Sequence, residues 1–314
     1  MKPVLIIRGD ASRIDEFKDI KSEFESYYAA SPEEYDGLID RLSERAEAVI
    51  TNGSIGLKTH QMEKLGKLRI VLCRGAGIEN VDIEQARARG ITVTNGAGVN
   101  WFTVADQAMT LLLGIVRDSV DMDRGCRADD WTVTRAIFRP TLHRKRIGIV
   151  GMGQIGKGIA RRAAGFEMEI FYTARSPKAE VEGTYVEDLK DLATRVDFLV
   201  LSLPGGAETR HIVDADILEA LGPTGYLVNV ARGSVVDTAA LIDALHTGRI
   251  AGAGLDVWEG EPDVPDALKT APRTLLSPHV GGFSPEAVDR SNRMITENIR
   301  AFFSGRHTEI RNRI

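Results

Sequence analysis

The sequence predicts an α/β protein with two doubly wound domains, each built on a parallel sheet. Short strands that are apolar throughout alternate with helical patterns, and such strands are typical of parallel sheets covered on both faces. One long apolar-periodic helix interrupts this alternation between residues 96 and 145, and the alternation then starts again. A chain of 314 residues is also longer than one hydrophobic core usually supports, so we expect two domains.

The expected strands are aliphatic or β-branched, and most of them end in Gly, Pro or Asn. They cover residues 3–9, 46–53, 68–75 and 91–95 before the long helix, and 146–153, 168–174, 197–204, 225–233 and 274–282 after it. Asn100 is a suitable N-cap for the long helix. Apolar residues recur at helical spacing along one face of this helix, at Val104, Ala108, Leu111, Leu112 and Ile115. We therefore expect it to run between the two domains.

The charge balance points to small-molecule partners. The 40 basic and 45 acidic residues give a net charge of -5 without long runs of one sign, so neither nucleic acid nor an anionic membrane is favoured. The apolar run Val4–Ile7 is too short for a signal peptide or a membrane span. Cys73 and Cys126 lie far apart, without metal-ligand spacing. We therefore expect a cytoplasmic, reduced protein with no metal site.

The stretch RIGIVGMGQIGKG carries the first chemical motif. Gly151, Gly153 and Gly156 form a G-x-G-x-x-G that directly follows an apolar strand and opens a helix. In dinucleotide-binding domains the first glycine permits the tight turn, the second admits the pyrophosphate, and the third packs helix against strand. We expect this loop, with Gln154 and Ile155 at the helix N-terminus, to bind a dinucleotide in a Rossmann-type domain. A Gly-rich turn without a ligand is the alternative.

The end of the next expected strand, FYTARSP, predicts which dinucleotide is bound. An NAD site normally places Asp or Glu about twenty residues past the second glycine, where it bonds the ribose 2′-hydroxyl. This chain has Arg175 and Ser176 there, just before Pro177. An arginine offers charged donors to a 2′-phosphate, so we expect NADP(H) to be preferred, with NAD as a second cofactor. The alternative is a solvated Arg175 in a site that binds NAD without its acid.

Three further motifs, NVARGSVVD, LDVWEGEP and SPHVGG, each follow an expected strand. Open α/β sheets bind ligands outside the carboxyl ends of their strands, so we expect Arg232, Glu261 and His279 to meet there. Reduction of a 2-oxo acid needs this set. Arg232 can hold the carboxylate and polarise the carbonyl, His279 can protonate the developing alkoxide, and Glu261 can orient His279 and favour its protonated form. Each residue alone is more often structural or solvated, and only their joint placement carries the prediction.

With these residues in place, the chain resembles the D-isomer-specific 2-hydroxyacid dehydrogenase family from its first strand through SPHVGG. The family's catalytic Arg, Glu and His correspond to Arg232, Glu261 and His279. Its glyoxylate/hydroxypyruvate reductase members have a similar Tyr-Thr-small-Arg run where FYTARSP stands. The resemblance implies an oxidoreductase that uses NADPH to reduce a small 2-oxo acid of the glyoxylate, hydroxypyruvate or 2-ketogluconate type.

The resemblance also implies cofactor contacts beyond the glycine loop. Asp256 matches the family's aspartate on the nicotinamide side, and Pro204 in SLPGG belongs to its proline-containing cofactor loop. Within the strand-end motifs we expect further cofactor contacts from Val230, Ala231 and Gly281.

For the substrate, the family's carboxylate loop matches Ala76 and Gly77, whose backbone amides would grip the acid. Arg74 either contacts hydroxyls or a second carboxylate of a longer substrate, or pairs with a nearby acid such as Glu79. By analogy, Asn52 lines the substrate cleft together with Ser54.

The same resemblance implies a flavodoxin-like substrate domain, residues 1–98 and 285–314, and a dinucleotide domain, residues 99–284. It implies a homodimer built around the helix after Asn100, with Trp131 reaching the partner's site as an aromatic wall. Glu167 in GFEM departs from the glycine of many relatives, which bears on local packing between helix and strand.

Two interpretations from other classes stay open. A nucleotide-sensing scaffold similar to the C-terminal-binding-protein co-repressors would keep the Arg, Glu and His set, and turnover of 2-oxo acids would separate the two. A phosphite dehydrogenase uses the same three residue types and differs in its substrate pocket. Formate dehydrogenases pair a Gln with the catalytic His, so Glu261 argues against them.

Overall fold

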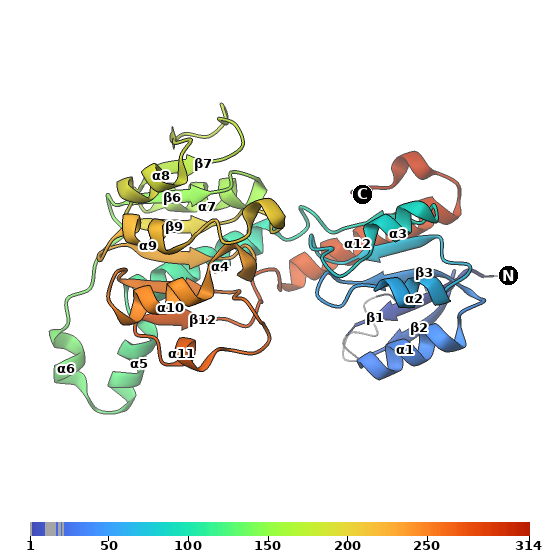
Figure 1. Ribbon diagram of the computed structural model, residues 1–314, viewed down its shortest axis with the longest axis horizontal. Coiled ribbons are helices and arrows are strands. Elements are labelled where there is room, and N and C mark those ends of the chain that lie inside the picture. The colour runs from blue at the N-terminus through green and yellow to red at the C-terminus, as the bar shows by residue number, and fades with distance from the viewer. Residues whose placement is uncertain (1, 10–16, 18–19, 21) are drawn as a thin grey trace. The chain divides into compact units, whose positions relative to one another are not determined.

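The computed structural model describes residues 2–9, 17, 20 and 22–314 of the chain (Figure 1). It consists of two compact units: one contains Met1–Asn100 and Phe283–Ile314, and the other contains Trp101–Gly282. Each unit is built on one sheet whose neighbouring strands run parallel. The predicted α/β class with two doubly wound parallel sheets is confirmed.

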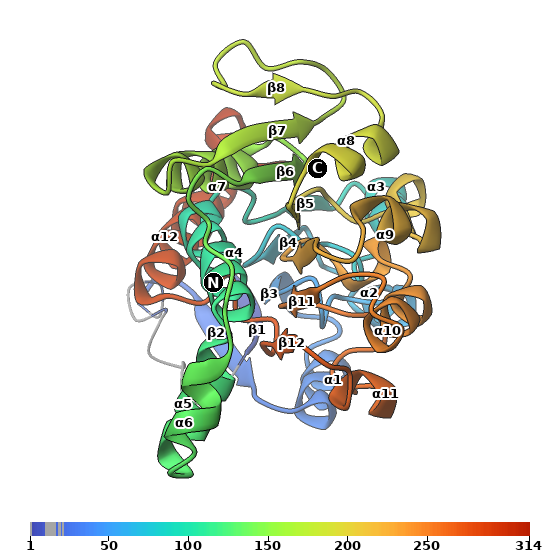
Figure 2. The ribbon, with the colours of Figure 1, turned by 90° about the vertical axis from the view of Figure 1, so that its left-hand side faces the viewer.

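The first unit has the strand order β2-β1-β3-β4-β5, which is the flavodoxin-like order. Its strands are β1 (Val4–Arg8), β2 (Glu25–Ala29), β3 (Ala46–Thr51), β4 (Ile70–Cys73) and β5 (Thr92–Thr94). Its helices are α1 (Pro32–Arg41), α2 (Thr59–Lys64), α3 (Ile83–Ala88), α12 (Pro285–Phe303) and the 3₁₀ turn η4 (His307–Glu309). Alternate strand residues form two cores: Val49 and Val71 pack with α1–α3, and Ile50 and Leu72 pack with α12 on the other face (Figure 2).

The second unit has the strand order β12-β11-β10-β9-β6-β7-β8. Its strands are β6 (Arg146–Val150), β7 (Glu169–Thr173), β8 (Thr184–Tyr185), β9 (Phe198–Leu201), β10 (Tyr226–Asn229), β11 (Gly252–Leu255) and β12 (Thr274–Leu276). Its helices are α4 (Trp101–Val116), α5 (Ser119–Arg127), α6 (Trp131–Ala136), α7 (Gln154–Gly165), α8 (Leu189–Arg195), α9 (Ala215–Leu221), α10 (Thr238–His246) and α11 (Asp266–Lys269), with 3₁₀ turns η2 (Ala207–Thr209) and η3 (Gly233–Val235). The chain winds outward from β6 in both directions, so the topological switch point lies between β6 and β9.

Helices cover both faces of this second sheet (Figure 2). On one face α4 and α7 pack on Ile149, Val200 and Val228, and on the other α8, α9 and α10 pack on Leu199 and Leu227. The apolar face predicted for the long helix is buried at all five of its positions, Val104, Ala108, Leu111, Leu112 and Ile115. Both sheets therefore direct all of their strand carboxyl ends to one edge within each unit.

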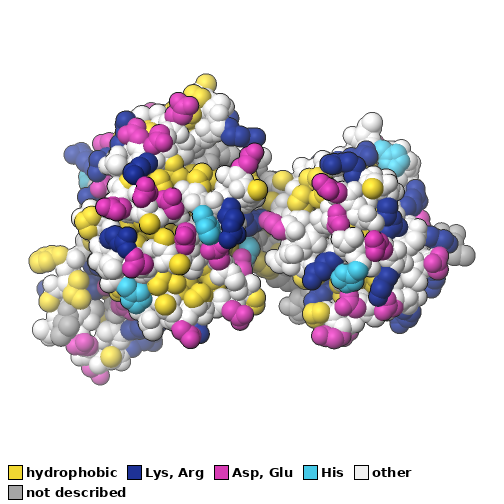
Figure 3. Space-filling view, viewed as in Figure 1, with side chains coloured by type: hydrophobic (Ala, Val, Ile, Leu, Met, Phe, Trp, Pro, Cys, Tyr) yellow, Lys and Arg dark blue, Asp and Glu magenta, His cyan; other side chains and the backbone are white. Residues whose placement is uncertain are grey.

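An arm, residues 117–140, extends from the second unit and carries α5 and α6 (Figure 1). Its base is fixed because the buried Arg139 guanidinium donates to the Asp118 carboxylate at 3.1 and 3.3 Å. Beyond this base α5 has no buried residue, while Trp131 is 63% exposed and Phe138 is 99% exposed. Hydrophobic side chains are visible on the arm in Figure 3. Among the described residues, no helix is long and apolar enough to cross a membrane.

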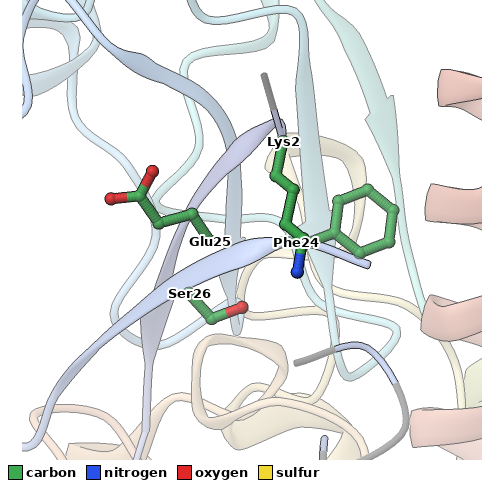
Figure 4. Close-up of a pocket in the computed structure, with 4 residues that line it drawn as sticks. All are labelled: Lys2, Phe24, Glu25 and Ser26. Carbon is green, nitrogen blue, oxygen red and sulfur yellow. The ribbon is translucent and has the colours of Figure 1, made fainter. Parts of the chain in front are cut away.

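A pocket lies at the amino ends of β1 and β2 and is lined by Lys2, Phe24, Glu25 and Ser26 (Figure 4). In Figure 4 the Glu25 carboxylate points away from Lys2, and it accepts two hydrogen bonds from Arg45 at 2.8 Å. Because open α/β sheets bind ligands at the carboxyl ends of their strands, this pocket is not part of the expected site.

Glu167 adopts a left-handed backbone conformation, with a φ of 57°, just after the C-cap of α7. This position favours glycine, which has no Cβ to strain. We expect Glu167→Gly to raise the free energy of unfolding by about 0.5–1 kcal/mol, because relief of strain exceeds the added chain entropy. Its exposed contact with His143, at 3.7 Å, should contribute little. Calorimetry should show a higher midpoint temperature of unfolding for Glu167→Gly and a lower one for Glu169→Gly, the matched control inside β7. A lower midpoint temperature for both variants would contradict the inference that the backbone is strained at Glu167.

Candidate active site

The glycine loop lies between β6 and α7 and has the shape that a dinucleotide needs. Gly151 has a φ of 95°, and a Cβ there would lie 2.8 Å from the Leu203 nitrogen. A Cβ on Gly156 would lie 2.2 Å from the Gly151 oxygen, whereas a Cβ on Gly153 would meet no described atom within 4 Å. Gly153 therefore leaves an open cradle at the start of α7, where no described side chain caps the amide groups from Gln154 onward. Uncapped amides at a helix N-terminus suit a phosphate, so these residues fit a bound pyrophosphate.

Two exposed residues and a lysine gather at the end of β7. Arg175 and Ser176 follow this strand directly, and no residue that the structure describes forms a hydrogen bond or ion pair with Arg175. The Lys178 ammonium donates to the Ser176 hydroxyl at 3.2 Å. The Tyr172 hydroxyl accepts from the Lys178 amide at 2.8 Å and so folds the segment back. This place thus holds two cations and a hydroxyl, and the sequence interpretation missed Lys178.

Arg232 follows β10 in a turn that is held by hydrogen bonds of a buried side-chain amide. The Asn229 side chain is 1% exposed; it accepts from the Ala231 amide and donates to the Arg232 carbonyl, both at 3.0 Å. A Cβ on Gly205 would lie 2.8 Å from Cγ of Arg232, so the SLPGG loop packs directly on the arginine. Val230 and Ala231 bury their side chains in the unit's core. Their amides are bonded within the unit, that of Val230 to the Leu201 carbonyl at 3.3 Å, so the cofactor contacts expected of both residues stay predictions.

His279 and Glu261 form a hydrogen-bonded pair. The distance from Nδ1 of His279 to Oε2 of Glu261 is 2.9 Å, and the two side chains are 39% and 29% exposed. The Glu261 carboxylate raises the pKa of His279 above its ordinary value, against the opposing effects of burial and of the Arg232 charge. No described residue hydrogen-bonds Nε2 of His279. The ring therefore keeps one nitrogen for an external partner while Glu261 favours its charged form.

Asp256 anchors the loop that carries His279. Its carboxylate is 3% exposed and accepts from the Ser277 hydroxyl at 2.6 Å, the Val280 amide at 3.0 Å and the Gly281 amide at 2.8 Å. His279 itself has a φ of 53°, a conformation that a non-glycine residue adopts only where its surroundings impose it. Asp256 thus has a positioning role, and the cofactor contacts expected of Asp256 and Gly281 stay predictions.

The SLPGG loop after β9 is tied to the glycine loop. The Ser202 hydroxyl donates to the Gly151 carbonyl at 2.8 Å, and the Thr209 hydroxyl donates to the Pro204 carbonyl at 2.9 Å. Since β6 and β9 flank the topological switch point, this is the place where a doubly wound sheet binds its ligand.

The predicted substrate residues lie in the first unit, at the carboxyl edge of that sheet. The amides of Ala76 and Gly77 donate to no described residue. Asn52 accepts from the Ile55 amide at 2.9 Å and so shapes its own turn. The Arg74 guanidinium lies 5.0 Å from the centre of the Phe17 ring. The roles expected of Arg74 and Asn52 in substrate binding stay predictions.

Within the described ranges no cluster of three or more His, Cys, Asp or Glu residues could hold a metal ion. The second unit by itself contains the glycine loop, the cationic end of β7, and Arg232 beside the Glu261–His279 pair. A dinucleotide cradle that shares a sheet edge with an arginine and a carboxylate-supported histidine defines an NAD(P)-dependent dehydrogenase.

Comparison with known proteins agrees with this class. The family model of the D-isomer specific 2-hydroxyacid dehydrogenase NAD binding domain matches residues 109–281. A glyoxylate reductase of Pyrococcus horikoshii is 37% identical over 316 residues, which cover 97% of this chain and 94% of the relative. A 2-ketogluconate reductase of Gluconobacter oxydans is 37% identical over 256 residues, 82% of this chain and 83% of the relative. The chain therefore belongs to the D-isomer specific 2-hydroxyacid dehydrogenase family, as its sequence motifs predicted.

A solved structure resembles the whole chain. The NADPH-dependent glyoxylate/hydroxypyruvate reductase of Sinorhizobium meliloti, crystallised with NADP and malonate, has a TM-score of 0.87 and 35% identity. The match covers 97% of this chain and 94% of that one.

Proposed function

We propose that the protein is an NADPH-dependent reductase that converts a small 2-oxo acid to the D-2-hydroxy acid. The contact of 2.9 Å between His279 and Glu261, with Arg232 near enough to affect the His279 pKa, carries this proposal. The names of the relatives support a substrate of the glyoxylate, hydroxypyruvate or 2-ketogluconate type.

The residues of the site would have distinct roles in this reduction. NADPH, when bound at the glycine loop, supplies the hydride. Arg232 holds the substrate carboxylate and polarises the carbonyl, and Nε2 of His279 donates its proton to the oxygen as negative charge develops there. Glu261 favours the protonated form of His279 and fixes the orientation of its ring.

We propose that residues 1–98 and 285–314 bind the substrate and that residues 99–284 bind the cofactor. The amides of Ala76 and Gly77, which donate to no described residue, suit a carboxylate, because neighbouring backbone N–H groups form anion-binding concavities. Arg74, Asn52 and Ser54 belong to the same proposal as residues that border the substrate.

The preference for NADPH rests on the end of β7. Arg175, Ser176 and Lys178 offer two positive charges and a hydroxyl, and residues 173–178 include no carboxylate that would repel a 2′-phosphate. NAD(H) would lack these charge-assisted contacts and serve as the weaker cofactor.

A substrate panel tests the proposed function. Glyoxylate, hydroxypyruvate, 2-ketogluconate, pyruvate and phenylpyruvate would each be assayed with NADPH and with NADH. We expect NADPH oxidation with at least one of the first three acids. Cofactor binding without turnover of any acid would favour a nucleotide-sensing scaffold, and reduction of NAD⁺ or NADP⁺ by phosphite would favour a phosphite dehydrogenase.

Glu261→Gln should move the pH profile of reduction to lower pH. In the wild type the carboxylate raises the pKa of His279, so the protonated acid persists to higher pH. The amide removes this charge, so the His279 pKa falls and the rate declines at a lower pH. The measurement is kcat/KM against pH for the wild type, Glu261→Gln and the exposed control Glu219→Gln. A profile that does not move would show that Glu261 has only a structural role.

We also propose a homodimer that works in the cytoplasm. The predicted apolar face of α4 is buried inside its own unit, and the arm that follows α4 carries exposed apolar side chains at Val120, Trp131, Ile137 and Phe138, which are available for an interface. Trp131, 63% exposed on this arm, would form an aromatic wall at the partner's site. Cys73 and Cys126 are both free thiols, which agrees with a reducing compartment.

Light scattering after gel filtration should give a mass of about twice the chain's 34.3 kDa. Phe138→Glu, which charges the most exposed aromatic ring of the arm, should shift the protein toward monomer because burying a charge is costly. The control Ile314→Glu, at an exposed apolar residue outside the arm, should leave the mass unchanged. A monomeric wild type would contradict the proposed dimer. A Phe138→Glu variant that remains dimeric would show that this part of the arm is not in the dimer interface.

A further inference from the structure

His211 connects three loops of the second unit. These loops follow β9, β10 and β11, which are neighbours in the sheet. His211 itself lies in the loop after β9, and its amide donates to the Ser234 carbonyl, in the loop after β10, at 2.8 Å. Its Nε2 lies 2.8 Å from Oε1 of Glu259, in the loop after β11. Glu259 stands two residues before Glu261, so His211 reaches the segment that supports His279.

Glu259 has other partners, but its contact with His211 is the shortest. The Arg210 guanidinium lies 3.3 Å from the same carboxylate oxygen on a side chain that is 60% exposed. The Thr238 amide donates to the other oxygen at 3.4 Å. The His211 side chain is only 33% exposed. Exposed and long contacts of this kind contribute little, so His211 is the main described side-chain partner of the Glu259 carboxylate.

The segment between Glu259 and Glu261 is short and closely packed. The Trp258 indole donates to the Asp263 carbonyl at 2.7 Å, and the Asp263 amide donates to the Gly260 carbonyl at 3.1 Å. A Cβ on Gly233 would lie 2.1 Å from the Trp258 carbonyl oxygen, so this turn rests directly on the loop of Arg232. Only Gly260 separates Glu259 from Glu261, so the backbone of this turn is the route by which Glu259 would act on Glu261.

The backbone of His211 is held in an unfavourable conformation. Its φ is 51°, in the left-handed region that non-glycine residues rarely adopt. Besides Glu259, the only described charged partner of its ring is Asp237, whose carboxylate lies 4.0 Å from Nδ1. Strained residues persist where the surrounding structure imposes them, and they cluster at functional sites.

We propose that His211 is a positioning residue that fixes Glu261 against His279 through Glu259. The proposal rests on the proposed function, because it assigns His279 as the proton donor. It differs from a purely structural role in one measurable way. Loss of the His211–Glu259 contact should loosen the Glu261–His279 bond and lower the pKa of His279.

Two substitutions separate the side-chain contact from the backbone strain. His211→Asn tolerates the left-handed conformation but is too short to reach Glu259. His211→Gln places an amide nitrogen near the position of Nε2 and can restore the contact. His246→Asn is the matched control, because His246 is exposed and its ring hydrogen-bonds, among the described residues, only the Ala267 carbonyl.

We expect His211→Asn to lower kcat by about tenfold, as a slightly misplaced catalytic group would. The decline of kcat/KM with rising pH should begin at lower pH, and NMR titration of the His279 ring should show a lower pKa. His211→Gln should recover most of both values. Combined with Glu261→Gln, His211→Asn should cause no further shift in pH, because both changes act on the same bond.

Wild-type kcat and an unmoved pH profile in His211→Asn would overturn the proposal. So would a lower kcat with an unchanged His279 pKa, which indicates a structural role alone. If His211→Asn fails to fold, Glu259→Ala breaks the same contact from the other side and must lower the His279 pKa. The NMR titration needs no turnover, so failure of the proposed function, seen as an inactive wild type, is distinguishable from failure of this inference.

Discussion

Replacing His279 with alanine is expected to lower kcat for 2-oxo acid reduction by about 10²–10⁴-fold, the usual contribution of a positioned acid. Nε2 of His279 has no hydrogen-bond partner among the described residues, and Glu261 favours the protonated form of the ring, so loss of His279 would leave the developing alkoxide without a proton donor. NADPH affinity should change little, because the glycine loop and the end of β7 do not involve this ring. Steady-state kinetics and a fluorescence titration with NADPH measure the two quantities separately.

His246→Ala is the control for this variant, since His246 is exposed and its ring hydrogen-bonds just one group that the structure describes, the Ala267 carbonyl. Full turnover in His279→Ala would remove His279 from the mechanism. A parallel loss of NADPH binding would instead show that the loop of residues 277–281 had collapsed, which the anchoring by Asp256 argues against.

The second large effect is expected at Arg175. Arg175→Ala should raise the KM for NADPH far more than the KM for NADH, because only NADPH carries the 2′-phosphate that the guanidinium would contact. Hydrogen bonds to charged groups contribute about 1.5–3 kcal/mol, which corresponds to roughly ten- to hundredfold in affinity. The measured quantity is the ratio of kcat/KM with NADPH to kcat/KM with NADH, at one salt concentration.

Neighbouring variants make this test specific. Lys178→Ala should lower the ratio in the same direction, since Lys178 lies beside Ser176. Ala174→Asp should lower it further by repelling the 2′-phosphate and offering a partner to the ribose hydroxyl. Arg195→Ala, at an exposed arginine paired with Asp191, is the control. A wild-type preference for NADH, or a ratio indifferent to Arg175, would show that FYTARSP is only a solvated strand end.

The sequence predicted most strands because their apolar runs are continuous, but it missed β2, β8 and β11. β11 reads Gly-Ala-Gly-Leu and has almost no β propensity. Its glycines are explained by packing: a Cβ on Gly254 would lie 2.9 Å from Leu111, on the helix that covers this strand. β8 has only two residues, and β2, ESYYA, is half-buried rather than apolar throughout.

In the site, residues that sit in motifs could be predicted, and residues that act through tertiary contacts could not. Arg232 and His279 follow strands that the sequence predicted, and parallel strands bring their carboxyl ends to one edge, whereas Glu261 follows β11, which was missed as a strand, and was predicted from its motif. The position of Lys178 beside Ser176 depends on the hydrogen bond by which Tyr172 folds the segment back. His211 contacts Glu259 because β9 and β11 flank β10 in the sheet. Asp256 was predicted to contact the cofactor, and its observed hydrogen bonds position the His279 loop.

The most direct test of the proposed function is the product formed from hydroxypyruvate and NADPH by the wild-type protein. Chiral chromatography of the glycerate, alongside absorbance of NADPH, measures both the reaction and its stereochemistry. We expect one D-glycerate for each NADPH oxidised, with a higher kcat/KM for NADPH than for NADH. Formation of L-glycerate, or the absence of NADPH oxidation with hydroxypyruvate and with every other acid of the panel, would contradict the account.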